Sequence, residues 1–259
     1  MKMLAFKLDT RIDFSIPVTH HNFLLRFVPV SGGVQEILTH NVVLKPSADV
    51  RYDTDAFGNC TISGSLLAPH TSFEYAVQGT ARVDLSARVP QQAHPMYNYG
   101  GRLTQPSDDL KAFAASLPLS GLSPQDKAVK IREAVSAHFA YTPGATGVAT
   151  TAAQSFALGK GVCQDYAQVM AVLCRLWGLP ARYCAGYTVG EGATHAWTEV
   201  CLPEMGWTGF DPTRNCMAGE SYLRVAVGRD YTDCPLDNGM FRGLADQTQT
   251  VLMQVQEIV

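Results

Sequence analysis

The chain has 259 residues, of which 46% are hydrophobic and 17% charged, and its 20 basic and 23 acidic residues give a formal net charge of -3. This composition excludes disordered, collagen-like and coiled-coil proteins and is typical of a compact protein with one large or two modest domains. Because lysines and arginines form no run in the sequence, the chain lacks the basic surface of a nucleic-acid-binding protein. We therefore expect no nucleic-acid partner.

The sequence contains no segment typical of secretion or membrane insertion. The first nine residues alternate in polarity and carry charge too early for a signal peptide. The most apolar helical stretch, residues 169–179, is interrupted by Arg175 and is far shorter than the ~20 residues of a membrane span. We expect a cytoplasmic protein with no membrane partner.

The seven cysteines are odd in number, widely spaced and free of any Cys-x-x-Cys pair. This usage argues against a disulfide framework and against a zinc site. We expect most of the cysteines to be reduced, buried side chains, and we expect neither a metal nor another cofactor.

The first hundred residues are predicted to be β structure. Period-2 alternation marks three runs, at 4–8, 23–27 and 73–77, and no helical periodicity interrupts them. Turn residues at 31–33, 55–59 and 78–79 are spaced like hairpin connections. An antiparallel β-sandwich is the simplest account of this pattern.

Residues 89–107 are rich in proline, glycine, glutamine and asparagine, which is typical of a linker. We place a domain boundary there, giving domains at residues 1–104 and 105–259. The second domain is predicted to be α+β.

Two helices are expected in the second domain. The first begins at Pro124 behind the cap Ser123, and the second begins at Cys163 and ends near Gly178. Strand patterns follow at 181–189, 193–202, 207–211 and 248–258.

Cys163 occupies the position in this pattern that is best suited to a nucleophile. A thiol in the first turn of a helix faces unpaired N–H groups and the positive end of the helix dipole, both of which stabilise the thiolate. A buried structural cysteine is the alternative, and it is the interpretation we give Cys174, in the interior of the same helix.

His195 and Asp211 are candidates for the partners of this thiol. His195 lies on a predicted strand with Trp197 on its face, and Asp211 ends the next strand before Pro212. A carboxylate beside an imidazole fixes its tautomer and stabilises the imidazolium formed when the histidine takes a thiol proton. The alternatives are an ordinary surface histidine and an Asp-Pro turn.

Strand parity makes this pairing testable. Side chains alternate between the faces of a strand, so a four-residue loop that pairs Leu202 with Trp207 would turn Asp211 away from His195. We predict an odd-length loop, such as residues 201–205, or an equivalent bulge. The five-residue loop would place the two side chains directly opposite each other.

Four segments carry a resemblance to a known family. These are Gly161-Val162-Cys163-Gln164-Asp165-Tyr166-Ala167, Gly178-Leu179-Pro180-Ala181-Arg182-Tyr183, His195-Ala196-Trp197-Thr198-Glu199-Val200 and Gly206-Trp207-Thr208-Gly209-Phe210-Asp211-Pro212-Thr213. They closely resemble the core of the bacterial transglutaminase-like superfamily of papain-type cysteine enzymes. Residues 225–231 look like the segment that follows this core, and residues 1–100 look like the β-rich domain that often precedes it.

The resemblance implies a papain-like fold in which Cys163 is the nucleophile, His195 the general base and acid, and Asp211 the orienting carboxylate. It implies a peptide or protein substrate and a thioester that either water or an amine resolves. It leaves the oligomeric state open. Because the sequence has no dense acidic cluster, it does not resemble the calcium-dependent animal enzymes in their regulation.

The N–H of Cys163 is expected to be one oxyanion-hole donor. Gln154, Trp197 and Trp207 are candidates for the second, each with an ordinary loop or core role as its alternative, and Asp165 is expected to be structural.

Two other functions remain open. One is a different acyl transfer, such as an arylamine N-acetyltransferase-like or peptide:N-glycanase-like activity, and the other is a non-enzymatic binding or assembly module.

Overall fold

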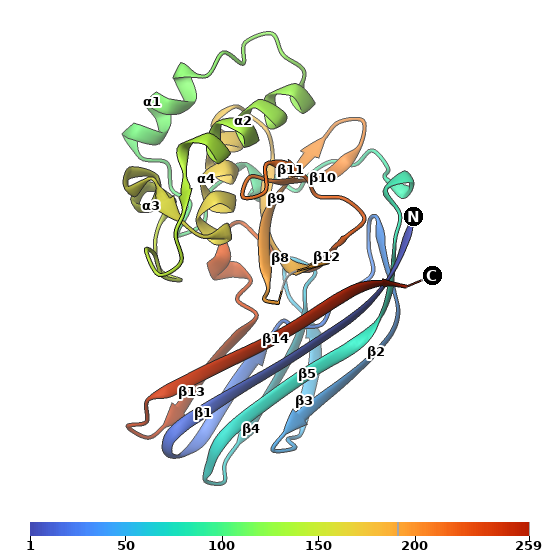
Figure 1. Ribbon diagram of the computed structural model, residues 1–259, viewed down its shortest axis with the longest axis vertical. Coiled ribbons are helices and arrows are strands. Elements are labelled where there is room, and N and C mark those ends of the chain that lie inside the picture. Colours follow the sequence, from blue (N-terminus) through green and yellow to red (C-terminus); the bar gives the residue numbers. More distant parts are fainter. Residues whose placement is uncertain (191, 259) are drawn as a thin grey trace.

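The protein is described from a computed structural model, which covers residues 1–190 and 192–258. Two antiparallel sheets dominate it: one of seven strands at the lower end of Figure 1 and one of five strands at the upper end, beside the helices. This is the expected α+β class, with antiparallel strands at the start of the chain.

The seven-stranded sheet is organised around its first strand. The 24 residues of β1 pair along their first half with β5 and β14 and along their second half with β4 and β13. The shared strand makes the sheet curl, so the predicted sandwich is one curled sheet. Its strands are β1 (Lys2–Leu25), β2 (Gln35–Lys45), β3 (Val50–Thr54), β4 (Cys60–Leu66), β5 (His70–Val83), β13 (Asp237–Arg242) and β14 (Gln247–Ile258).

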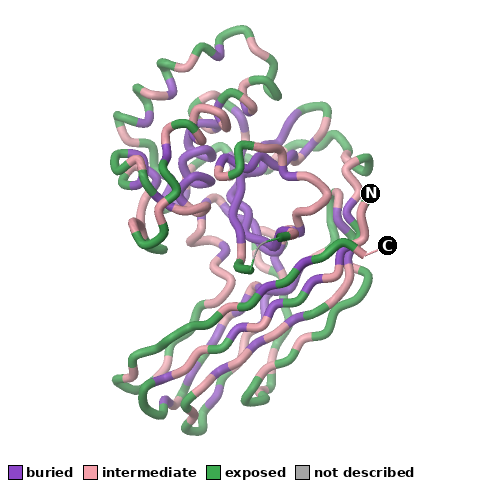
Figure 2. Tube along the Cα trace, viewed as in Figure 1, coloured by how far each residue is buried: buried purple, intermediate pink, exposed green. Residues whose placement is uncertain are grey.

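Alternation along β1 and β5 places one face of the curled sheet in a hydrophobic core. The core residues contributed by these two strands include Leu4, Phe6, Leu8, Phe73 and Val77. Over most of β1 and β5 the buried residues alternate with less buried ones, as the period-2 pattern predicts, and the colour of the tube changes repeatedly along the strands of this sheet in Figure 2.

The last two strands of the chain, β13 and β14, do not follow the expected domain boundary at residue 104, because they belong to the curled sheet. The division puts β13 and β14 in the domain of residues 105–259, but both strands pair with β1, as in the register Met3 to Ile258. A strand's own sequence shows that it needs a partner without showing which strand the partner is. The two ends of the chain therefore lie side by side (Figure 1).

The expected turn at Gln78-Gly79 is wrong, because both residues lie inside β5. At Gly79 a side chain has no room: a Cβ would lie 2.1 Å from the Thr39 carbonyl oxygen and 2.7 Å from the Phe6 ring. The glycine thus marks a close approach of β2 at a bulge, and not a reversal of the chain.

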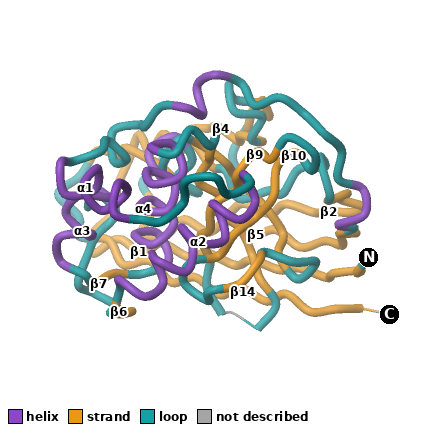
Figure 3. Tube along the Cα trace, turned by 90° about the horizontal axis from the view of Figure 1, so that it is seen from above, coloured by secondary structure: helices purple, strands orange, loops and turns teal. Residues whose placement is uncertain are grey.

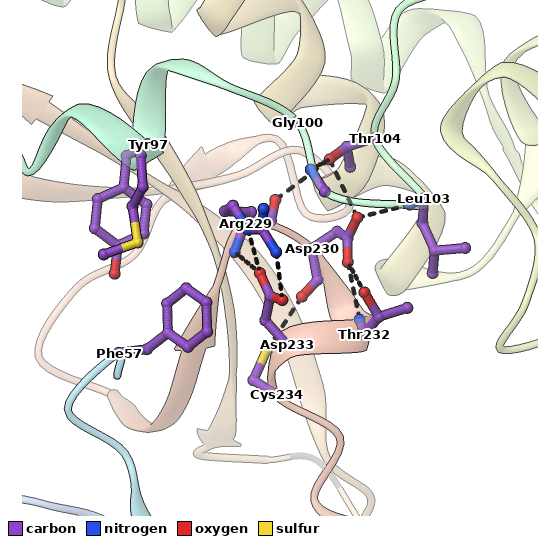
Figure 4. Close-up of polar contacts among 12 residues, drawn as sticks. Phe57, Tyr97, Gly100, Leu103, Thr104, Arg229, Asp230, Thr232, Asp233 and Cys234 are labelled. Atoms are coloured by element: carbon purple, nitrogen blue, oxygen red, sulfur yellow. Dashed lines mark hydrogen bonds and ion pairs between the residues drawn. The ribbon is translucent and has the colours of Figure 1, made fainter. Parts of the chain in front are cut away.

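The connection between the sheets, residues 84–107, is ordered by short 3-10 helices at Leu85–Ala87 and Pro95–Asn98 and by buried side chains. Its end is fixed by Asp230, which is fully buried and accepts hydrogen bonds from the Leu103 and Thr232 N–H groups (Figure 4). Asp230 also caps the 3-10 helix Tyr231–Asp233.

The five-stranded sheet has the order β11-β10-β9-β8-β12 and is antiparallel throughout. Its strands are β8 (Ala181–Thr188), β9 (His195–Leu202), β10 (Gly206–Asp211), β11 (Cys216–Met217) and β12 (Tyr222–Gly228). Every residue of β8 and β9 is buried, so these strands form the centre of this half.

Four helices gather at one side of the molecule (Figure 3): α1 (Asp108–Ser116), α2 (Pro124–His138), α3 (Ala152–Leu158) and α4 (Cys163–Leu176). Ser123 caps α2 as predicted, with its hydroxyl accepting from the Asp126 N–H. α4 runs through the centre of a second core that includes Ile131, Phe156 and Val200. The short strands β6 (Ala140–Tyr141) and β7 (Lys160–Gly161) pair in parallel beside it.

Two buried amide side chains join the two sheets. Gln35 and Asn59 each accept from a backbone N–H of β12 and donate to the carbonyl of the same residue, at Arg224 and Val227, over 2.8 to 2.9 Å bonds. They satisfy the edge of the five-stranded sheet as another strand would. Tyr187 from β8 packs into the core of the curled sheet as well.

Candidate active site

Cys163 is the first residue of α4, where the sequence predicted a helix to begin. Its own N–H has no partner within the helix because an α-helix leaves its first four donors unpaired. Its side chain is partly buried, and it is one of the residues that line a cavity.

Asp165 fixes the loop that leads to this thiol, which agrees with its expected structural role. Its carboxylate accepts from the Val162 N–H at 2.8 Å and from the Thr146 hydroxyl at 2.6 Å. Burial raises the pKa of this carboxyl. The carboxylate packs so closely on Gly161 that a Cβ there would lie 2.5 Å from Oδ2, which accounts for the glycine before the cysteine.

His195 and Asp211 are brought together from neighbouring strands. The His195 Nε2 atom lies 2.7 Å from Asp211 Oδ2, and the two residues are 5% and 0% exposed. His195 is therefore a buried histidine with an ionic partner and not an ordinary surface residue.

The hairpin between β9 and β10 explains this contact. Leu202 pairs with Gly206, so the loop has three residues, and Gly206 adopts a left-handed φ of 64°. The predicted odd loop length is confirmed, but the five-residue example is wrong. Phe210 pairs with Thr198, so Asp211 shares the face of His195 and lies one diagonal step away.

The Asp211 carboxylate makes four hydrogen bonds. Oδ1 accepts from the Thr213 and Arg214 N–H groups at 2.9 and 3.1 Å, and Oδ2 accepts from His195 and from the Tyr222 hydroxyl, the latter at 2.8 Å. The Asp-Pro turn and the contact with the imidazole thus use the same side chain. Tyr222, on β12, was not identified from the sequence.

Electrostatics favours the charged form of this histidine. Burial lowers the pKa of His195, but hydrogen bonds and charges of Asp211 and Cys163 outweigh it and raise the pKa to about 9. For Asp211, burial raises the pKa, and the bonds from His195 and Tyr222 outweigh it so that the net pKa is lowered. The arrangement therefore stabilises an imidazolium between a carboxylate and a thiol.

The cavity in front of Cys163 has a volume of about 270 Å³ and is walled by both halves of the molecule. One wall contains Cys163, Tyr183 and His195. The other comes from the curled sheet, and its residues are Leu8, Thr10, Tyr75, Asp237, Gln249 and Val251.

A larger hollow of about 490 Å³ lies on the curled sheet, among Lys7, Arg11, Lys45 and Glu74. These side chains form ion pairs with one another or with neighbouring aspartates. The hollow contains no cysteine or histidine, so the cavity at Cys163 is the candidate site.

The three candidates for a second oxyanion donor do not line the cavity. Gln154 forms a capping box with Thr151 at the start of α3, and its Oε1 accepts from the Thr151 N–H at 2.9 Å. Trp207 stacks under the Arg182 guanidinium, 4.1 Å from the ring centre. Trp197 packs beside His195 and Tyr222 in the interior. Each has the ordinary structural role that was its alternative.

All seven cysteines are free thiols, and four of them are buried. Burial raises the pKa of Cys174 to about 12 and raises the pKa values of Cys184 and Cys234 well above the ordinary value. Over residues 1–190 and 192–258, no group of three or more His, Cys, Asp or Glu side chains could hold a metal ion. Within the same residues, no helix is long and apolar enough to cross a membrane.

Two family profiles match the chain. Residues 111–212, which include Cys163, His195 and Asp211, match the transglutaminase-like superfamily, and residues 4–82 match the bacterial transglutaminase-like N-terminal region.

Similar proteins include uncharacterized and named bacterial proteins. A Mycobacterium leprae protein of uncharacterized function is 26% identical over 274 residues, covering 96% of this chain and 97% of the relative. The protein-glutamine gamma-glutamyltransferase of Pseudomonas aeruginosa is 37% identical over 125 residues, covering 41% of this chain and 19% of that protein.

The whole fold has a counterpart among solved structures. The crystal structure of a candidate cysteine protease from Cytophaga hutchinsonii superposes with a TM-score of 0.82 at 20% identity, covering 100% of this chain and 92% of that one. At this identity the likeness concerns the fold.

Proposed function

We propose, from the premise that the chain belongs to the transglutaminase-like superfamily, that it is a cysteine-dependent amide hydrolase or acyltransferase acting on peptides or proteins. The observation that supports this most is the arrangement of Cys163, His195 and Asp211. A thiol at a helix N-terminus and a histidine with a buried carboxylate partner line one cavity.

In the proposed reaction the Cys163 thiolate attacks the carbonyl carbon of an amide. The electron pair moves to the carbonyl oxygen, and the Cys163 N–H at the start of α4 is placed to stabilise the resulting oxyanion. The His195 imidazolium then gives its proton to the leaving nitrogen as the C–N bond breaks. The products of this half-reaction are a free amine and a thioester on Cys163.

The second half-reaction resolves the thioester. His195, now neutral, takes a proton from water or from a second amine, which attacks the thioester carbonyl. Water yields a carboxylic acid and an amine yields a new amide, with the thiolate and imidazolium restored in both cases. Asp211 holds the ring through Nε2 in both half-reactions and stabilises the imidazolium each time it forms.

A cytoplasmic location is part of this proposal. The seven thiols are free, as in a reducing compartment, where disulfides are rare. Cell fractionation with an antibody against the chain tests it: recovery with periplasmic or secreted markers would contradict a cytoplasmic location.

The proposed activity is tested by incubating the protein with a peptide library and a labelled primary amine, followed by mass spectrometry. Cleaved peptides are expected from hydrolysis and labelled peptides from transamidation. Cys163→Ala should remove both products, whereas Cys174→Ala, which alters a buried thiol of the same helix, should retain them. Equal product from the wild type and Cys163→Ala would rule the proposal out.

A further inference from the structure

The wall of the cavity that faces Cys163 carries a carboxylate. Asp237, the first residue of β13, lines the cavity together with Tyr75 of β5 and Gln249 of β14. None of these three residues belongs to the segments matched by the family core, residues 111–212. Asp237 and Gln249 reach the cavity because β13 and β14 pair with β1, and Tyr75 because β5 does.

Asp237 is held in place through one of its two oxygens. The Tyr75 hydroxyl and the Gln249 side-chain amide both donate to Oδ2. Tyr75 is 2% exposed, and burial together with the Asp237 charge raises its pKa, so that it stays a neutral donor. The carboxylate is thus oriented by two neutral groups.

The charge of Asp237 has no counterion among the residues that the structure describes. Across residues 1–190 and 192–258, no lysine, arginine or histidine forms an ion pair with it, and its Oδ1 accepts no hydrogen bond. Its charge also acts on the cavity residue Tyr231, whose pKa burial and Asp237 raise to about 12. The second oxygen is thus free to accept a charge-assisted hydrogen bond from a cationic ligand.

The rest of the lining suits an aliphatic stem. Leu8, Val148, Leu236 and Val251 are apolar, and Asp237 is the one carboxylate among the described residues of the lining. Tyrosine rings at 75, 183 and 231 complete it, and aromatic faces also favour cations. A volume of about 270 Å³ has room for a group about the size of one side chain.

We propose that Asp237, held by Tyr75 and Gln249, binds an ammonium group of the acyl-donor substrate beside the amide that Cys163 attacks. This inference rests on the proposed function, because it assigns the substrate class of the same cavity. The ammonium is either the free N-terminus of a peptide or a lysine side chain, since both offer the same charge on an aliphatic stem.

The bound ammonium is not the attacking amine. A carboxylate that binds an ammonium stabilises its protonated form, whereas an amine must be neutral to attack a thioester. Asp237 would therefore slow an amine that it held. The cation belongs to the part of the substrate that is recognised and not to the group that reacts.

A first experiment probes the cavity without a known substrate. Methanethiosulfonate reagents transfer their thiol group to a thiolate, forming a mixed disulfide and releasing methanesulfinate. The rate at Cys163 is measured by peptide mass mapping with an aminoethyl reagent, which is cationic, and with a sulfonatoethyl reagent, which is anionic. The quantity compared between variants is the cation-to-anion rate ratio.

Asp237→Asn is expected to lower this ratio roughly three- to tenfold, as the loss of one partly screened charge predicts. The amide oxygen still accepts from Tyr75 and Gln249, so the variant keeps its local bonds. Asp246→Asn is the control, because Asp246 is exposed and lies outside the cavity, and it should change the ratio less than twofold.

The outcomes separate the two proposals. If Cys163 reacts faster than the other thiols but Asp237→Asn leaves the ratio unchanged, the ammonium site is wrong and the proposed function stands. If Cys163 reacts no faster than the buried thiols, the proposed function is contradicted, and the ammonium site that rests on it is contradicted as well.

A second experiment identifies the source of the ammonium. Peptides with the same scissile amide are compared with a free or acetylated N-terminus and with lysine or norleucine beside that amide. We expect kcat/KM to fall about tenfold in one of the two neutral forms, and Asp237→Asn to abolish that difference. A fall in kcat/KM on acetylation identifies the N-terminus as the bound ammonium. A fall on replacing lysine by norleucine identifies the lysine side chain. Equal kcat/KM for all forms would overturn the ammonium site.

Discussion

The two halves of the molecule differ in how far apart in the sequence their cavity residues lie. In the helical half, Cys163, His195 and Asp211 lie within 50 residues of sequence, on one helix and two neighbouring strands. In the curled sheet, Leu8, Tyr75, Asp237 and Gln249 come from four strands spread over the whole chain, yet they wall the same cavity.

This difference reflects how each set is assembled. A helix start and a hairpin are local structures, so their residue spacing determines which side chains meet. The curled sheet is closed by pairing between distant strands, and spacing says little about such pairs. The proposed catalytic residues of the helical half can thus be inferred from sequence, whereas the side chains that the sheet contributes to the cavity depend on the fold.

The largest expected difference in activity is between alanine variants of two cysteines on the same helix, Cys163 and Cys174. Cys163→Ala should lower kcat/KM at least about 10⁴-fold, because it removes the proposed nucleophile. Cys174→Ala should keep the activity and cost about 1 kcal/mol of unfolding free energy, because it leaves a small space in the core. Steady-state rates and urea denaturation measure the two. Activity loss in Cys174→Ala alone would reverse the comparison.

A second pair consists of two fully buried aspartates, Asp211 and Asp230. Asp211→Asn should lower kcat about 10²- to 10⁴-fold, since the imidazole remains but is poorly oriented. Asp230→Asn should leave kcat within about threefold and cost about 1–3 kcal/mol of stability, because the carboxylate is surrounded by donors from 103, 104 and 232 (Figure 4).

Equal losses of kcat in these two variants, at temperatures where both are folded, would contradict the distinction between a carboxylate that orients His195 and a structural carboxylate. Circular dichroism at the assay temperature provides the folding control.

Gly79→Ala tests the stability of the curled sheet separately from the reactivity of Cys163. The added Cβ overlaps the Thr39 backbone and the Phe6 ring, so we expect a loss of about 1–3 kcal/mol of unfolding free energy. The alkylation rate of Cys163 in the folded state should not change. Gly147→Ala, where a Cβ meets nothing within 4 Å, is the matched control and should be nearly neutral. Equal free energies of unfolding for the two variants would contradict this prediction and would show that β2 can shift away from residue 79 to make room for the added Cβ.

The smallest expected effect concerns pH. Because the pKa of His195 is raised to about 9, the imidazolium persists above neutrality and kcat/KM should fall only near pH 9. Asp211 is one cause of this rise, so Asp211→Asn should move the alkaline limb to lower pH, by about one unit.

The same histidine stabilises the folded state below its unfolded pKa of 6.5, and this stabilisation is lost as pH rises through about 9.

An alkaline limb that stays in place in Asp211→Asn would show that the carboxylate does not act on the imidazole. Rates measured from about pH 6 to about pH 10 in buffers of constant ionic strength locate this alkaline limb.

Much of the site could be predicted because its positions are local. Helix caps predicted the start of α4, and strand parity required the odd hairpin that unites His195 and Asp211. The loop length was wrong because a left-handed Gly206 allows a three-residue turn. Tyr222 was missed, since β12 reaches Asp211 only after the sheet has formed.

Some missed features did have a signal in the sequence. Thr151 and Gln154 have the spacing of a capping box, which predicts the short helix α3 and explains why Gln154 is not free to act as an oxyanion donor. Alternation at 248–258 predicted β14 as a strand, but its pairing with β1 needs the three-dimensional structure.

The position of β1 also bears on how the molecule folds. Its first half needs β14, and the bonded side chains of Lys2 and Glu257 are 255 positions apart. Contacts of such long range are slow to form, because a large loop must close before they contribute stability. During translation one edge of β1 stays unpaired until β14, at the end of the chain, has been synthesised. Leu8, Thr10 and Tyr75 are synthesised before Cys163, whereas Asp237, Gln249 and Val251 follow it, so the wall that faces the thiol is completed last.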